Sequence, residues 1–261
     1  MLKNKLIKLA LLLTISVSSI GLAEKAAADG HEKPDAGAEA MAMETAVCSF
    51  RDGKTYADFQ KVVDKFKKWA ANSDYNTYFV SNTPLYASPQ AMPDVVLMEF
   101  SSFEGIATAW KKIWEDEPQF LESFEKTMSC SRSLMHYYPM HTNVELEPDD
   151  DRIMGVNWCT RKPGVTWDQL SKQHQEFSFG PDVIYWGAAG PSLGIREGDM
   201  PGEFAHLAVF SDIEGLMRYE NQVANENGWR RREAYYQNFA ECTGTNVYQQ
   251  EVLLRPTDQG E

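Results

Sequence analysis

The sequence predicts an α+β fold built from two copies of one β-α-β-β-α-β unit. Two observations lead to this prediction. The segment Phe-Ser-Ser-Phe-Glu-Gly-Ile at 100–106 returns as Phe-Ser-Asp-Ile-Glu-Gly-Leu at 210–216. The four cysteines also divide evenly, with one near the start and one near the end of each copy. A chain of 261 residues has room for two such units, each within the usual size of a domain.

Each copy of the repeated segment is expected to join a strand to a helix. An apolar run ends in it, 95–100 in the first copy and 204–210 in the second, and such a run indicates a buried strand. Ser101 and Ser211 are each followed three positions later by a glutamate, which is the capping-box pattern. We therefore expect these two serines to cap the following helices.

The other elements are expected in the same order in both halves. The first half, residues 44–144, is expected to hold strands at 45–50, 76–80, 95–100 and 134–138 and helices over 56–69, 103–114 and 120–126. The second half, residues 153–254, is expected to hold strands at 153–159, 183–187, 204–210 and 245–253 and helices at 166–178, 213–225 and 229–239. Thr55 should cap the first helix, and Thr166 with Gln169 should form a capping box. We interpret the acidic segment 145–152 as a solvated linker and the Gly- and Pro-rich segment 188–202 as a loop.

The N-terminal segment has the layout of a secretory signal peptide. Within residues 1–23, lysines precede an apolar run that is too short to span a membrane, and small residues follow it. Cleavage is expected after Ala23 or, as a second choice, within 26–28. Residues 24–43 are rich in small and acidic residues and are expected to be a disordered leader, and 255–261 to be a tail. The protein is therefore expected to be periplasmic or secreted.

The net charge argues against several classes of partner. The chain carries a formal charge of −13, and removal of the lysine-containing signal peptide makes it more negative. Such a surface repels phosphate groups, and the sequence contains neither a basic patch nor a nucleic-acid motif to offset this repulsion. We therefore expect no nucleic-acid partner and no membrane association after cleavage.

The cysteines are expected to form disulfides, because export exposes them to an oxidising compartment. Four cysteines allow three pairings. The repeat selects Cys48 with Cys130 and Cys159 with Cys242, since each pair then lies within one copy at nearly equal separation. A metal site is not expected, because the sequence has no C-x-x-C motif and no histidine at ligand spacing from a cysteine.

Three features resemble a known superfamily. They are the element order, the strand-to-helix joints at 100–105 and 210–215, and the short helix with Phe120 and Phe124. Each half resembles the ferredoxin-like subunit of the dimeric α/β-barrel superfamily, which includes antibiotic-biosynthesis monooxygenases, haem-degrading monooxygenases, stress-responsive barrel proteins and chlorite-dismutase-like haem proteins. The resemblance implies two tandem ferredoxin-like modules that close into an α/β barrel within one chain. Such a chain is a monomer with a pseudo-dimeric repeat, or it assembles into a higher homo-oligomer.

Polar residues on the strands of the second half are the candidates for a ligand site. Asn157 corresponds to Ala46 in the first half and His206 to Val96, so the two copies differ there in polarity. These side chains either face solvent or line an enclosed pocket between the closed sheets. The candidates are Asn157, Trp186, His206, Asn246 and Tyr248 in the second half and His136 and Tyr138 in the first.

Three functions remain open from the sequence. The first is binding of a small, largely apolar molecule, with no catalytic residue assigned. The second is a cofactor-independent monooxygenase of the antibiotic-biosynthesis type, in which Asn157, Trp186 and His206 orient the substrate. The third is haem binding of the chlorite-dismutase kind, for which the resemblance suggests a histidine ligand and His174 is one candidate. No other cofactor and no metal is expected.

Overall fold

The computed structural model describes residues 39–88, 92–143, 150–195 and 199–256. The expected signal peptide, most of the expected leader, most of the expected linker and the end of the tail lie outside the described residues. Within the described part of the chain, no helix combines the length and the apolar character needed to cross a membrane.

The two halves contain matching elements in the same order. The first half contains β1 (Met41–Phe50), α1 (Tyr56–Ala70), β2 (Tyr78–Tyr86), β3 (Val95–Ser101), α2 (Phe103–Asp116), α3 (Phe120–Thr127) and β4 (Met128–Thr142). The second half contains β5 (Asp151–Arg161), α4 (Trp167–Gln175), β6 (Val183–Leu193), β7 (Phe204–Phe210), α5 (Ile213–Asn225), α6 (Gly228–Asn238), β8 (Ala240–Cys242) and β9 (Asn246–Leu254). β8 and β9 both pair with β5, so together they take the place that β4 has beside β1.

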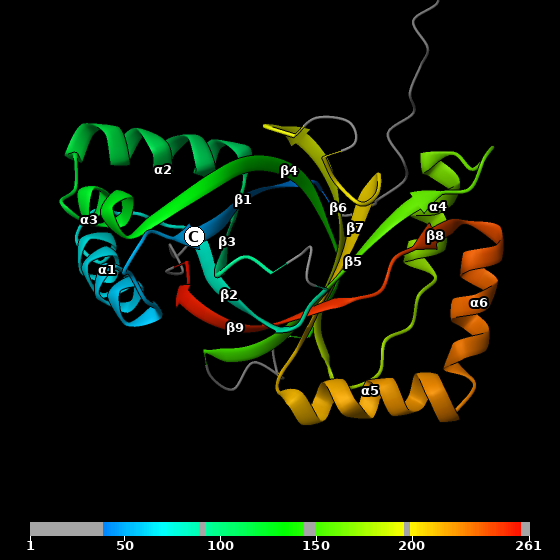
Figure 1. Ribbon diagram of the computed structural model, residues 1–261. Helices are drawn as coiled ribbons and strands as arrows, with labels where there is room; N and C mark the ends of the chain where they lie inside the picture. Colours follow the sequence, from blue (N-terminus) through cyan, green and yellow to red (C-terminus); the bar gives the residue numbers. More distant parts are fainter. Residues whose placement is uncertain (1–38, 89–91, 144–149, 196–198, 257–261) are drawn as a thin grey trace, which may run out of the picture. The chain divides into compact units, whose positions relative to one another are not determined.

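The strands close into one antiparallel barrel (Figure 1). The first half contributes the order β4-β1-β3-β2, and the second contributes β9-β5-β7-β6. β2 pairs with β9 and β4 pairs with β6, so each half completes the sheet of the other. The expected α+β class and the intrachain barrel are therefore confirmed.

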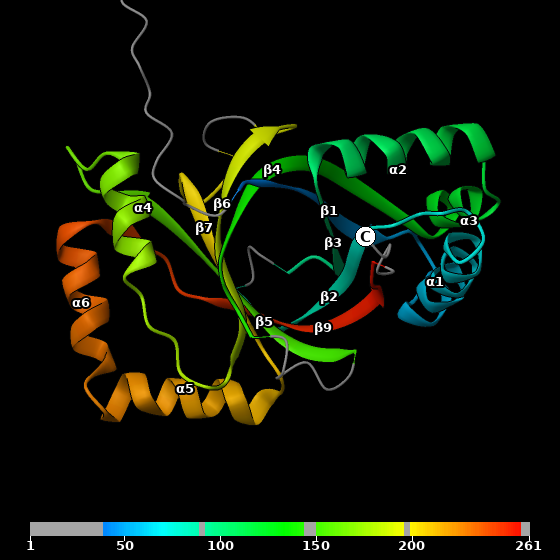
Figure 2. The ribbon, with the colours of Figure 1, turned by 180° about the vertical axis from the view of Figure 1, so that it is seen from behind.

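The helices lie outside the barrel in two groups. α1, α2 and α3 cover the strands of the first half, and α4, α5 and α6 lie beside the second half (Figure 2). The largest cluster of buried apolar residues comes from the strands alone and fills the barrel interior. Its larger members are Met43, Met98, Met135, Tyr137, Met154, Ile184, Leu207 and Tyr248. Each strand therefore has one face toward this interior and one face toward the helices.

Both predicted disulfides are present. Cys48 lies directly opposite Cys130 on β1 and β4, and Cys159 lies directly opposite Cys242 on β5 and β8. Cys48 and Cys159 belong to clusters that also contain helix residues, so both bridges lie on the helix-facing side of the sheet.

Several strands extend beyond their expected limits. β1 begins inside the expected leader, and the last two positions of the expected linker, Asp151 and Arg152, belong to β5. β4 includes Cys130 and His141, and β6 continues to Leu193, inside the expected loop 188–202. For β4 and β6 the physical reason is that they pair with each other across the two halves, and the local sequence does not show such a long-range pairing.

The two helices of the repeated segment begin where they are expected, at Phe103 and Ile213, but each is capped by the residue after the predicted one. The side chains of Ser102 and Asp212, not those of Ser101 and Ser211, accept hydrogen bonds from the third residue of the helix. Serine and aspartate are both favoured N-caps, so the segment offered two adjacent candidates. The capping box of Thr166 with Gln169 is confirmed.

Candidate functional site

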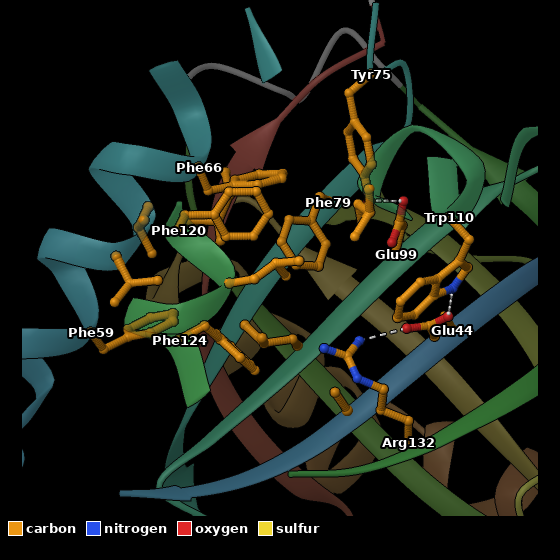
Figure 3. A pocket seen from close by; sticks show the side chains of 17 residues that line it. Glu44, Phe59, Phe66, Tyr75, Phe79, Glu99, Trp110, Phe120, Phe124 and Arg132 are labelled. Atoms are coloured by element: carbon orange, nitrogen blue, oxygen red, sulfur yellow. Dashed lines mark hydrogen bonds and ion pairs between the residues drawn. The ribbon is translucent and has the colours of Figure 1, made fainter. Parts of the chain in front are cut away.

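A cavity of about 70 Å³ lies between the helix-facing side of the first-half strands and the helices α1, α2 and α3 (Figure 3). Its wall is mostly aromatic and aliphatic. The apolar lining includes Phe59, Val62, Val63, Phe66, Phe79, Leu97, Ile113, Phe120, Phe124 and Leu253. The cavity is therefore an apolar space with side chains from both layers of the fold.

The sequence of α1 explains why residues of this helix line the cavity. Phe59, Val62, Val63 and Phe66 recur at steps of three and four residues and are all buried, which puts them on one face of the helix. The ring of Phe66 contacts Phe79 of β2 edge-on, with 5.1 Å between the ring centroids. Such edge contacts hold the aromatic wall in a fixed arrangement.

One end of the cavity is polar. Glu44 and Glu99 are directly paired across β1 and β3, and both line the cavity. Nε1 of Trp110 donates to Oε2 of Glu44 at 2.6 Å, and Nη1 of Arg132 donates to Oε1 of the same carboxylate at 2.7 Å. Glu44 is thus held between two donors, as Figure 3 shows.

Glu99 is the most deeply buried acid of the cavity, with 7% of its surface exposed. The hydroxyl of Tyr75 donates to its Oε1 at 2.6 Å. Loss of water raises the pKa of the Glu99 carboxyl, although the hydrogen bond from Tyr75 acts in the opposite direction. Burial also raises the pKa of Tyr75, so its hydroxyl stays protonated and remains a donor.

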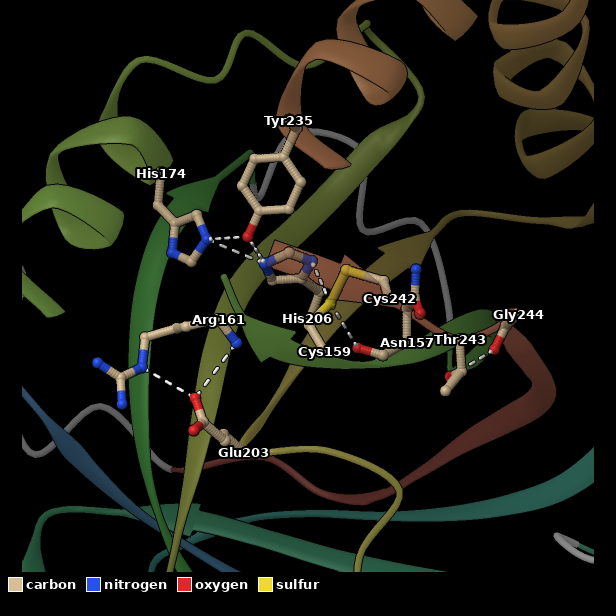
Figure 4. The surroundings of a disulfide bond; sticks show 10 residues. All are labelled: Asn157, Cys159, Arg161, His174, Glu203, His206, Tyr235, Cys242, Thr243 and Gly244. Atoms are coloured by element: carbon tan, nitrogen blue, oxygen red, sulfur yellow. Dashed lines mark hydrogen bonds and ion pairs between the residues drawn. A yellow bond between two sulfur atoms is a disulfide. The ribbon is translucent and has the colours of Figure 1, made fainter. Parts of the chain in front are cut away.

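A second cluster of polar side chains occupies the helix-facing side of the second half (Figure 4). Nε2 of His174, on α4, lies 2.8 Å from the hydroxyl of Tyr235, on α6. Nε2 of His206, on β7, lies 3.1 Å from the same nitrogen of His174. Burial lowers the pKa of His174 to about 4 and holds the pKa of His206 well below its ordinary value. Both imidazoles are therefore neutral at physiological pH.

Three of the predicted site residues lie together in this second cluster. Asn157 is paired directly opposite His206 across β5 and β7, and the rings of Trp186 and His206 lie 5.1 Å apart. Oδ1 of Asn157 is buried and has no hydrogen-bond partner among the residues that the structure describes. The arrangement brings an unpaired acceptor close to a neutral imidazole.

The other predicted site residues lie elsewhere. Tyr248 belongs to the interior cluster of the barrel, and Oδ1 of Asn246 accepts from the backbone N–H of Ser88 at 3.1 Å. His136 and Tyr138 are exposed on β4, and the ring of His136 lies against Phe103. The seven predicted residues are therefore not one group.

The position matched to His206 also differs from the prediction. Cys48 is paired with Val95 and Cys159 with Phe204, so the residue two positions farther is Leu97 in the first half and His206 in the second. Val96 instead belongs to the barrel interior. The first half therefore has an apolar residue, Leu97, at the position that matches His206.

The polar residues of the cavity in the first half were not among the predicted site residues. Glu99 offered a signal, because it is the one acid within the apolar run 95–100. A charged residue there must either face water or be buried with partners. Glu44, Tyr75, Trp110 and Arg132 offered no comparable signal, since all four are ordinary in their local sequence.

His174 does not fit the role of a haem ligand. Its Nε2 is in contact with Tyr235 and His206, and the residue is 3% exposed, so this nitrogen is not open to an iron atom. The cavity of the first half, about 70 Å³, is far smaller than pockets for larger ligands, which begin at about 300 Å³. It is also lined by no histidine.

Comparisons with known proteins support the fold. No family model matches the chain, and no curated protein matches its sequence. A putative monooxygenase from Fusobacterium nucleatum aligns with a TM-score of 0.55 at 9% identity, covering 85% of this chain and 96% of that one. A putative monooxygenase from Lactobacillus acidophilus aligns with a TM-score of 0.52 at 10% identity, covering 83% and 95%. At these identities the likeness concerns the fold alone, and it agrees with the fold that the resemblance implied.

Proposed function

We propose that this protein is exported and binds a compact, largely apolar molecule in the cavity of the first half. The observation that carries the proposal is a cavity with an aromatic wall and two carboxyl groups at one end. Ligand sites in proteins combine these features, because apolar walls provide affinity and a few polar groups fix orientation. No catalysis is assigned to the site.

The polar end defines the ligand further. Glu44 already accepts from Trp110 and Arg132, and Glu99 accepts from Tyr75, but each carboxyl oxygen has capacity for another bond. A ligand with an apolar body and one hydrogen-bond donor satisfies both parts of the site. A small aromatic amine is the simplest molecule of this kind.

The two halves have diverged, in our proposal, from one duplicated ferredoxin-like module. Glu44 lies four residues before Cys48, and the residue four before Cys159 is Gly155. Glu99 is paired with Glu44, whereas Gly155 is paired with Ala208. The polar end of the cavity therefore has no counterpart in the second half, which supports a ligand site in the first half alone.

Two observations support export to the periplasm or the medium. The N-terminal 23 residues have the signal-peptide layout, and four cysteines form two disulfides. Mass spectrometry of the protein from a culture tests this point, because cleavage after Ala23 fixes the mass. A retained N-terminus contradicts export. Size-exclusion chromatography with light scattering decides between the monomer and a higher homo-oligomer.

Ligand binding is tested by titration of the full mature protein with benzylamine, phenol and toluene, followed by calorimetry and tryptophan fluorescence. We expect benzylamine and phenol, which carry a donor group, to bind more tightly than toluene, which carries none. Val63→Phe, which fills the cavity, should weaken binding at least about tenfold. Val47→Phe is the control, because Val47 is 43% exposed and lies outside the cavity lining. Equal binding by the two variants, or no binding by the wild type, contradicts the proposal.

A monooxygenase activity is the second candidate, because Asn157, Trp186 and His206 lie together as that hypothesis requires. Oxygen uptake with quinol-type substrates tests it. Turnover that is abolished by His206→Ala and retained by Leu97→Ala, the matched position in the first half, supports this activity. Absence of oxygen uptake in the wild type excludes it for the substrates used.

A further inference from the structure

The disulfide of the second half lies against an imidazole nitrogen. Nδ1 of His206 is 3.7 Å from Sγ of Cys159. His206 and the two cysteines each offer one ligand atom, and these atoms all lie within 4.8 Å of one another. Figure 4 shows the imidazole of His206 beside the disulfide. Two sulfurs and one imidazole nitrogen at such distances form the donor set of a zinc site, provided that the sulfurs are thiolates.

We propose that reduction of the Cys159–Cys242 disulfide creates a zinc site formed by these two cysteines and Nδ1 of His206. A dithiol supplies two electrons and two protons, breaks the S–S bond and is itself oxidised to a disulfide. The two cysteine thiols then release their protons to solvent as Zn²⁺ binds, since the thiolate is the ligand. While the disulfide is closed, neither sulfur is a thiolate and the site is masked.

The surroundings orient His206 for this role. Its Nε2 lies 3.1 Å from Nε2 of His174 and 3.4 Å from the hydroxyl of Tyr235. A proton on Nε2 of His206 can be donated to either group, and Nδ1 then carries the lone pair that a metal requires. A hydrogen bond to the second ring nitrogen is the usual support of a metal-binding histidine.

The position also offers access and a further oxygen. Cys242 is only partly buried, so a small dithiol approaches the bridge from that side. Asn157 is directly opposite His206 and has a buried Oδ1 without a hydrogen-bond partner in the described part of the chain. Zinc sites with three protein ligands also bind a water molecule. We assign to Asn157 the role of accepting a hydrogen bond from that water, because its Oδ1 is an unused acceptor on the strand beside His206.

The other disulfide provides an internal control. Cys48–Cys130 has the same placement on the sheet, but Leu97 stands where the second half has His206. Reduction of this bridge yields two thiolates without an imidazole. We therefore expect reduction to create a metal site in the second half and none in the first.

The experiment uses the full mature chain in two forms, wild type and Cys48→Ser/Cys130→Ser. Each is reduced with dithiothreitol, which is then removed by gel filtration without oxygen, and titrated with Co²⁺ as a spectroscopic probe and then with Zn²⁺. We expect one cobalt ion per chain with sulfur-to-metal absorption in both forms, displacement by zinc, and no such absorption before reduction. His206→Leu, which copies the first half, should weaken binding at least about tenfold.

Several outcomes overturn the proposal. These are absence of binding after reduction, equal binding before reduction, two metal ions per wild-type chain, or undiminished affinity in His206→Leu. Circular dichroism accompanies each titration. A reduced chain that has lost its fold and binds metal as well without His206 counts against the site, because binding then comes from the thiols alone.

Discussion

The hydroxyl of Tyr75 lies 2.6 Å from Oε1 of Glu99, which places a donor against a carboxyl group that is 7% exposed. Tyr75 precedes β2, whereas Glu99 lies on β3, so the bond connects a loop to the sheet at the cavity. Buried acids without such a partner are strongly destabilising. The pair therefore affects both the stability of the first half and the polarity of the proposed site.

Replacement of Glu99 by glutamine should change the pH dependence of stability. The pKa of Glu99 is raised above its ordinary value of 4.5 in the folded protein, so the folded state holds this proton more tightly than the unfolded state. The contribution of Glu99 to the free energy of unfolding is therefore fully present below about pH 4.5. It is lost as the pH rises through the raised pKa, by at most about 1.4 kcal/mol per pH unit.

Denaturant unfolding of the wild type and Glu99→Gln between pH 4 and pH 8 measures this effect. We expect the difference in unfolding free energy to shift in favour of the variant as the pH rises. Other carboxyl groups titrate in both proteins and cancel in the difference. A difference that is constant over this range contradicts a raised pKa.

Tyr75→Phe should lower the free energy of unfolding by about 1 to 3 kcal/mol, because it removes a buried donor and leaves the Glu99 oxygen without it. Tyr86→Phe is the matched control, since Tyr86 is 56% exposed. Thermal and urea unfolding at pH 7 provide the comparison. Equal stability of the two variants means that the hydrogen bond contributes nothing to folding.

Removal of either disulfide should cost a similar amount. The bridges close segments of nearly equal length, with sequence separations of 82 and 83. Loop-closure entropy then predicts comparable losses, on the order of 2 to 5 kcal/mol for each. The variants are Cys48→Ser/Cys130→Ser and Cys159→Ser/Cys242→Ser, measured under oxidising conditions after peptide mapping of the remaining bridge. A large difference between them shows that local packing outweighs the entropy of the unfolded chain.

The repeat predicted the order of elements and the disulfides but not the direction of each side chain. Phe100 and Phe210 occupy the same place in the repeated segment, yet Phe100 packs against the barrel interior and Phe210 against a cluster with helix residues. One residue separates β3 from α2, whereas two separate β7 from α5. Because side chains alternate along a strand, this one-residue difference reverses the faces.

The same difference explains why part of the candidate site was predicted and part was not. Asn157 was matched correctly to Ala46, because the cysteines on β1 and β5 fix that alignment. His206 was matched to Val96 instead of Leu97, one position away. The cavity of the first half depends on contacts between α1, α2, α3 and the sheet. Such long-range contacts cannot be predicted from the local sequence.

Barrel closure gives the last prediction, because β6 of the second half approaches β4 of the first closely at Gly187. A Cβ atom at this position would lie 2.5 Å from the backbone oxygen of Tyr138 and 2.6 Å from the ring of Tyr137. Gly190 lies on the same strand and has nothing within 4 Å of such an atom. The two glycines therefore separate a steric effect from a change in strand propensity.

Gly187→Ala should destabilise the protein by about 1 to 3 kcal/mol, as overpacking of a core does. Gly190→Ala should be neutral or stabilising by up to about 1 kcal/mol, because alanine restricts the unfolded chain more than glycine. Urea unfolding of both variants against the wild type measures the two values. If Gly187→Ala is as stable as Gly190→Ala, β4 and β6 are not in close contact there, and the two halves do not close into the barrel in this way.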